Sequence, residues 1–290
     1  MKFRFIFGVG FLFCVCLVTS SITYAYQEAK LWSVWEAHDD ANEQAVIDHS
    51  VFDDFLKKYV ALGYVNKLRY KEVTQEDEEL LEAYLNTLEA LPISIYPREQ
   101  QLFYWINLYN AYVIKSVLNH YPVASVEDID LSPELFREGP WQQKVLTIEG
   151  YQVSLSDIKN LILRPIWRDP RILYTLHSAH IGSPYIQPYA WTPERFDTHI
   201  DTIIRDYINH PYTVSVSSEG ILTISSFYDW YSGDFGEENT SLIDHLTQYA
   251  DLPLQEKLKS VDSDFVYDYD FSLNEELTEK PQPTEDEPTQ

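Results

Sequence analysis

The first half of the chain carries hydrophobic residues at helical spacing. Apolar residues three or four apart over residues 51–59, and again over residues 80–88, predict two amphipathic helices. Thr74, followed three residues later by Asp77, is typical of the start of the second helix. Over residues 97–120 apolar side chains point in nearly every direction around a helical axis, and this pattern predicts a buried central helix.

The second half carries short alternating segments that are typical of β-strands. Two pairs of such segments surround turns that contain Gly150 and Gly220, and each pair predicts a β-hairpin. The paired segments are residues 145–148 with 151–155, and residues 213–217 with 221–224. Single strands are expected over residues 172–178 and 265–271.

Three further helices are expected, over residues 156–166, 193–209 and 241–250. Helices that come early, followed by hairpins and short strands, favour an α+β fold over a doubly wound parallel sheet. We therefore predict a helix-rich N-terminal half around a buried central helix, with antiparallel hairpins and short strands in the second half. No internal repeat and no glycine-rich phosphate loop occurs in the sequence.

The two ends of the chain differ in composition from the part between them. Lys2 and Arg4 precede an apolar run that is too short to span a bilayer, and Ala25 closes a signal-peptidase pattern. We expect residues 1–25 to be a signal peptide, residues 26–274 a single domain, and residues 275–290 a disordered acidic tail. The signal predicts a periplasmic or secreted protein without membrane insertion.

Composition narrows the chemistry further. Cys14, Cys16 and Met1 all lie in the predicted signal peptide, so the mature chain is expected to contain no sulfur. This excludes disulfides, thiolate metal sites and a cysteine nucleophile. The formal charge of −25 becomes more negative when Lys2 and Arg4 are removed, and such a chain repels nucleic acid. No cofactor is indicated.

Small, polar and imidazole side chains gather around Ser178, at the end of the predicted strand. A serine nucleophile needs a base within hydrogen-bond reach. His177 and Ser178 point to opposite faces of an extended strand, so His180 or a distant residue would have to act as the base. Two other interpretations remain: the segment is structural, or His177 and His180 bind a metal ion.

Asn107 and Asn110 are two amides of the predicted central helix, three residues apart on one face. Buried amides must find hydrogen-bond partners. They either orient a loop or ligand at a site or tie the helix to neighbouring backbone, and we favour the second interpretation.

Several motifs together resemble the bacterial family called domain of unknown function 547, over about residues 50–274. The motifs are Phe103-Tyr104-Trp105-Ile106-Asn107-Leu108-Tyr109-Asn110-Ala111, His120-Tyr121-Pro122-Val123, Leu155-Ser156-Asp157-Ile158, Asp169-Pro170-Arg171-Ile172 and Trp230-Tyr231-Ser232-Gly233-Asp234-Phe235-Gly236. By analogy with some members, the resemblance also implies a papain-like or transglutaminase-like architecture.

The resemblance implies a thiol-type active site whose parts are replaced in this chain. The family usually carries cysteine at the positions of Ser178 and Ser183, and a Glu-His pair where this chain has Lys159 and Asn160. The implied pocket is formed by five residues: Asn107, Asn110, Lys159, Asn160 and Ser183.

These observations favour a non-catalytic function. The interpretation is a binding or regulatory module, a pseudoenzyme with a degenerate thiol-type site, whose partner is an unknown small molecule, peptide or protein. One alternative is a serine-dependent hydrolase or acyl transferase that uses Ser178, with His180 or His177 as the base. The other is a metal-binding protein that uses His177 and His180.

Export of the chain is expected to remove residues 1–25, because the charged start, the apolar middle and Ala25 agree with one cleavage site. Intact-mass measurement on protein recovered from the export pathway checks this. The expected mass begins at Tyr26, and a mature species that retains Met1 contradicts the prediction.

Overall fold

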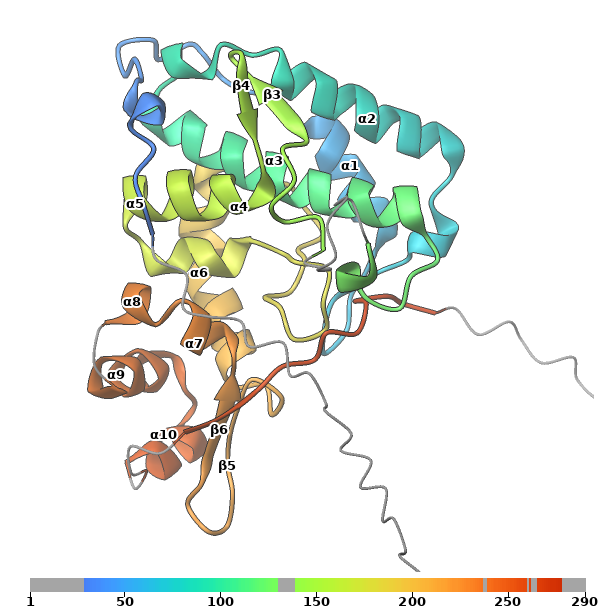
Figure 1. The fold of residues 1–290 in the computed structure, drawn as a ribbon. Coiled ribbons are helices and arrows are strands. Elements are labelled where there is room, and N and C mark those ends of the chain that lie inside the picture. The colour runs from blue at the N-terminus through green and yellow to red at the C-terminus, as the bar shows by residue number, and fades with distance from the viewer. Residues whose placement is uncertain (1–28, 130–138, 237–238, 260, 262–264, 278–290) are drawn as a thin grey trace, which may run out of the picture.

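The computed structural model describes residues 29–129, 139–236, 239–259, 261 and 265–277 (Figure 1). The predicted signal peptide and residues 278–290 of the predicted tail lie outside the described residues. Within them the architecture is α+β, as the sequence pattern predicted. No helix in this part of the chain has both the length and the apolar character needed to cross a membrane.

Helix α3 (Arg98–His120) lies at the centre, as predicted. Every residue from 101 to 111 is buried, so the helix has no solvent-facing side along these three turns. Helix α2 (Gln75–Glu89) packs against α3 and against α1 (Ser50–Tyr59). On another side α3 contacts the helical segment 155–167 and α6 (Pro193–Ile208) (Figure 1). Burial by neighbours on all sides explains why apolar residues occur all around α3.

Polar side chains at the helix starts place several of these helices. Thr74 accepts a hydrogen bond from the Asp77 backbone at the start of α2, as the sequence predicted. Thr192 accepts one from the Arg195 backbone at the start of α6, where Pro193 occupies the first position. Proline fits there because the first turn of a helix has no internal partner for its missing N–H group.

The strands form three small sheets, and both predicted hairpins are present. The sheets are β1 (Val60–Ala61) with β2 (Lys67–Leu68), β3 (Leu146–Ile148) with β4 (Tyr151–Val153), and β5 (Val214–Val216) with β6 (Leu222–Ser225) and β7 (Phe265–Asp268). The two hairpins are antiparallel, whereas β7 runs parallel to β6. Between β6 and β7 lie α7 (Phe227–Trp230), α8 (Ser232–Phe235), α9 (Asn239–Tyr249) and α10 (Leu252–Leu258).

The strand predicted over residues 172–178 is wrong. Pro170–Thr175 form a 3₁₀ helix, and the chain continues through residues 176–178 without regular structure. The Asp169 side chain caps this helix by accepting from the Arg171 backbone N–H at 3.0 Å. A short apolar run does not distinguish a strand from a buried helical turn, and here the cap decides in favour of the turn.

The helix predicted over residues 156–166 is present, but its middle is a π-helix. Leu155–Asp157 (α4) and Arg164–Trp167 (α5) flank the π-helical segment Ile158–Leu163. Pro165 has no N–H to donate to the carbonyl of Leu161, and this carbonyl accepts from Trp32 N at 2.9 Å instead. Such wide turns are frequent at functional sites, and this one contains Lys159 and Asn160.

Residues 269–277 form a segment that we call the C-terminal strap. Figure 1 shows it in red, running from the β5–β6–β7 sheet past the loops below the helical part. Its backbone hydrogen bonds reach three distant segments, at Gly182, Ala124 and Leu68. Glu275 and Glu276 were predicted to begin the tail, yet Glu276 N donates to Leu68 O at 3.1 Å and Glu275 accepts from the Tyr121 hydroxyl. These contacts place both residues in the fold.

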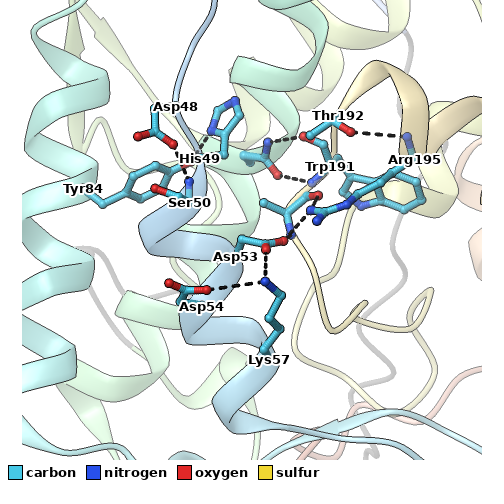
Figure 2. A network of polar contacts seen from close by, with 12 residues as sticks. Asp48, His49, Ser50, Asp53, Asp54, Lys57, Tyr84, Trp191, Thr192 and Arg195 are labelled. Atoms are coloured by element: carbon cyan, nitrogen blue, oxygen red, sulfur yellow. Dashed lines mark hydrogen bonds and ion pairs between the residues drawn. The ribbon is translucent and has the colours of Figure 1, made fainter.

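A buried carboxylate joins α1 to the start of α6 (Figure 2). Asp53 on α1 accepts from Ala190 N at 3.0 Å, pairs with Lys57 at 2.5 Å and forms an ion pair with Arg195. Burial opposes its charge, but these donors outweigh burial and lower the pKa of Asp53. The segment that leads into α6 is thereby fixed to α1.

Asn107 on α3 binds the same segment one residue further on. Its amide nitrogen donates to Trp191 O at 2.8 Å, and its amide oxygen accepts from Trp191 N, also at 2.8 Å. The side chain is fully buried, so neither peptide group of Trp191 has water as a substitute partner.

Asn107→Leu is expected to destabilise the protein by about 1–3 kcal/mol, although it adds apolar bulk, because it strands the buried N–H and C=O of Trp191. Urea unfolding measures the difference. Asn119→Leu, at the exposed end of the same helix, is the matched control and should change stability little. An unchanged midpoint in Asn107→Leu contradicts the prediction.

Truncation after Asn274 is expected to lower the melting temperature, because it removes the contacts of Glu275 and Glu276 with Tyr121 and Leu68. A decrease of about 2–4 °C is expected for each kcal/mol lost in a chain of this size. Truncation after Leu277 keeps these contacts and is the control. Equal melting temperatures for the two truncated proteins would show that the last strap residues contribute nothing.

Candidate functional site

The side chain of Asn110 on α3 holds the backbone around Ser178. Asn110 donates from its amide nitrogen to Thr175 O at 2.8 Å, and its amide oxygen accepts from His177 N at 2.8 Å. Asn107 and Asn110 therefore both bind loop backbone, which is the role that the sequence analysis favoured. Asn110 acts on the site indirectly, because it fixes the residue next to Ser178.

The residue after Ser178 has a strained conformation. Ala179 is buried and has a φ of 57°, in the left-handed region that favours glycine. Its carbonyl accepts from Asn274 N of the strap at 2.8 Å. Strained residues of this kind occur often at functional sites, where the surrounding structure holds them in place. Ser178 itself remains partly exposed.

The hydroxyl of Ser178 contacts a phenol rather than an imidazole. Its Oγ lies 3.3 Å from the hydroxyl oxygen of Tyr269, which in turn lies 3.4 Å from Nδ1 of His180. On the other side of the ring, His180 Nε2 lies 3.6 Å from Glu127 Oε1. The four groups form a series, but each separation exceeds the usual length of a strong hydrogen bond.

His180 is the imidazole of this series and is neutral at physiological pH. Burial, together with the nearby charges of His177 and Lys159, lowers the pKa of His180 to about 3. Its neighbour Glu127 also accepts from the indole Nε1 of Trp141 at 3.0 Å. Glu127 Oε2 and His180 Nε2 are both buried and without hydrogen-bond partners among the described residues.

Lys159 lies among aromatic rings instead of carboxylates. Its Nζ is 5.2 Å from the ring centre of Tyr231, 5.7 Å from that of Tyr109 and 5.8 Å from that of Trp141. In the described part of the chain no Asp or Glu oxygen comes within ion-pair distance of it. Cation–π contacts contribute about 0.5–2 kcal/mol each, whereas taking an ammonium ion out of water costs several kcal/mol.

The charge of Lys159 is nevertheless retained. Burial opposes it, but the phenol groups of Tyr109 and Tyr231 support it, so the pKa of Lys159 lies above its ordinary value. Lys159 is therefore a cation at neutral pH and cannot accept a proton there.

Asn160, the neighbour of Lys159, takes part in a different network. Its amide nitrogen donates to Ser156 Oγ at 3.1 Å, and its amide oxygen accepts from Arg164 at 2.8 Å. Arg164 is buried, forms an ion pair with Asp234 and lies over the ring of Tyr231. These two contacts of the Asn160 side chain lie within its own helical segment, residues 155–167.

His177 and Ser183 contact each other and not the hydroxyl of Ser178. His177 Nδ1 lies 3.4 Å from Ser183 Oγ, and Ser183 donates to the backbone oxygen of His180 at 2.8 Å. His177 also lines a small crevice that lies beside α1 and α3, together with Phe52, Leu56, Asn110, Thr175, Ile186, Gln187, Tyr189 and Trp191. Within the described residues, no three His, Asp or Glu side chains gather in a way that could hold a metal ion.

Sequence reasoning missed the residues that surround Ser178 and Lys159 in space: Glu127, Tyr109, Trp141, Tyr231 and Tyr269. Tyr109 and Tyr231 belong to the motifs behind the family resemblance, and Tyr269 belongs to the alternation near the end of the chain. Their aromatic character was read as core volume or strand pattern. Glu127 and Trp141 carry no local signal that separates them from other residues of their kind.

Comparison with known proteins supports the resemblance over part of the chain. No curated protein and no solved structure matches the chain significantly, so a papain-like or transglutaminase-like architecture stays a prediction. Residues 93–208 match one family model, and they contain α3, Lys159, Ser178 and His180 but not the strap. Over this segment the chain resembles the family described as "Protein of unknown function, DUF547".

Proposed function

We propose that this chain is an exported binding or regulatory module whose pocket retains the position of a thiol-type active site without its chemistry. The observation that carries the proposal is the environment of Ser178, whose hydroxyl has the phenol of Tyr269 as its neighbour at 3.3 Å. A serine hydroxyl is a weak nucleophile unless a base takes its proton.

None of the groups nearest to Ser178 is suited to act as that base. Burial raises the pKa of Tyr269 well above its ordinary value, so its phenol keeps its proton at neutral pH. His180 is neutral and lies next to Tyr269, with no hydrogen bond to Ser178. Asn160, at the position where the resembled family carries histidine, is an amide and cannot accept a proton.

The charge of Lys159 also argues against a catalytic function. It takes the position where the resembled family carries glutamate, so a cation replaces an anion beside the pocket. A carboxylate orients a histidine and stabilises its charged form, whereas a cation opposes that charge. The substitution removes the support that a thiol-type site would need.

Two observations favour a second candidate, the serine-dependent hydrolase or acyl transferase. One is the series from Ser178 through Tyr269 and His180 to Glu127, which would act if its distances shortened on ligand binding. The other is the left-handed backbone of Ala179 directly after the serine. The experiment below separates this candidate from the binding module.

Ser178 is expected to form no covalent adduct with a fluorophosphonate probe at neutral pH, because no base activates its hydroxyl. Intact-mass spectrometry measures labelling of the wild-type protein and of Ser178→Ala. Ser178→Cys is the control for access: its thiol should alkylate with iodoacetamide, though slowly, which shows that small reagents reach the position. If the probe labels the wild-type protein stoichiometrically and Ser178→Ala abolishes this labelling, the protein is a serine enzyme and not a binding module.

A further inference from the structure

Unsatisfied polar groups gather around the caged ammonium of Lys159. The hydroxyl of Tyr109, whose ring is one wall of the cage, is buried and faces the ammonium of Lys159, which donates hydrogen bonds but cannot accept one. The O–H of Tyr109 therefore has no acceptor among the described residues, and Nε2 of the nearby His180 is buried without a partner there as well. Buried polar groups in folded proteins nearly always have partners, so unpaired ones beside a partly exposed cation point to a ligand.

Some residues of this cluster are exposed to solvent. Lys159, Ser178 and Tyr269 are partly exposed, whereas Tyr109 and Tyr231 are buried beneath them. Tyr269 is close enough to both buried tyrosines for charges on them to affect its titration. Lys159 therefore contacts the buried rings of Tyr109 and Tyr231 and is itself partly exposed to solvent.

We infer that this site binds a carboxylate group, with the ammonium of Lys159 as its counter-ion and the hydroxyl of Tyr109 as a hydrogen-bond donor. The inference rests on the proposed binding function and names the class of ligand that the pocket takes. A carboxylate accepts hydrogen bonds from several donors at once and supplies a negative charge that Lys159 does not receive from any described residue.

Other classes of ligand fit less well. The aromatic cage would suit a cationic ligand, but the protein's own ammonium already occupies it. A phosphate dianion would bring two negative charges to a single lysine, in a cluster that also contains the carboxylate of Glu127. One cation matches the single charge of a carboxylate.

The carboxylate can come from a small organic acid or from the C-terminus of a peptide. Both present the same planar group, so the structure assigns the chemistry that they share. Calorimetric titration of the mature protein at constant ionic strength distinguishes them with four probes: sodium acetate, N-acetyl-dialanine, N-acetyl-dialanine amide and inorganic phosphate.

The wild-type protein is expected to bind at least one of the two carboxylates, and to bind the amide and phosphate at least tenfold more weakly. Equal binding of acetate and N-acetyl-dialanine identifies a small-acid site, whereas binding of N-acetyl-dialanine alone identifies a peptide terminus. No binding of either carboxylate, or equal binding of phosphate, overturns the inference.

Variants of Lys159 test its role directly. Lys159→Gln should weaken carboxylate binding at least tenfold, and Lys159→Arg, which keeps the charge, should retain most of it. Lys115→Gln is the matched control, because Lys115 on α3 already pairs with Glu78 and Glu82 at 3.0 Å each. Unchanged binding in Lys159→Gln overturns the inference.

Two further measurements, the melting temperature and fluorophosphonate labelling, distinguish loss of carboxylate binding from misfolding and from failure of the proposed function. Lys159→Gln breaks no ion pair with a described residue, and it removes the cost of burying a charge together with the cation–π contacts. A melting temperature close to that of the wild type shows that the fold is intact, so loss of binding then reflects loss of the charge. Failure to bind carboxylates leaves the fluorophosphonate result unchanged. Labelling of Ser178 by the probe would contradict the binding module even if carboxylates bind.

Discussion

The middle of α3 has no exposed side, so its polar side chains must be satisfied inside the protein, and the amides of Asn107 and Asn110 meet this constraint by binding backbone. Asn107 holds both peptide groups of Trp191, and Asn110 bridges Thr175 and His177. The loop between these points has little regular structure of its own. The amides therefore give this loop a fixed course, and with it the position of Ser178.

The site that results is unusual in its electrostatics. The chain is strongly acidic, yet Lys159 has no carboxylate partner among the described residues. Three aromatic rings lie around this cation, and burial keeps the adjacent His180 neutral. This charge distribution is the basis of the proposal that the candidate site holds an anion and does not activate Ser178.

The C-terminal strap contacts the loop around Ser178 from far along the chain. Tyr269 reaches the hydroxyl of Ser178, and the backbone of the strap pairs with the loop at Ala179 and Gly182. A Cβ atom on Gly182 would lie 2.9 Å from the backbone of Asp270, so only glycine permits this close approach. The segment that matches the family model ends at residue 208, and the remainder of the chain thus supplies one wall of the site.

Local sequence determined most of the secondary structure. The helices α1, α2, α3 and α6 and both hairpins follow from periodicity, caps and glycine turns, because these signals act between residues a few positions apart. The family resemblance pointed to Lys159, Asn160, Ser178 and Ser183 as candidates for one site, and the residues around Ser178 added His177 and His180 as candidates. The predicted strand over residues 172–178 failed because its apolar residues are buried equally well in a capped 3₁₀ turn.

Only the tertiary structure decided how the site is composed. The contact between Ser178 and Tyr269 joins residues 91 positions apart, and Glu127 and Trp141 come from a third region of the chain. The side chain of Asn160 bonds to Arg164, while that of its neighbour Lys159 lies among the rings. Such contacts depend on how the helices, the loop and the strap pack together, and no signal within a few residues of sequence specifies that packing.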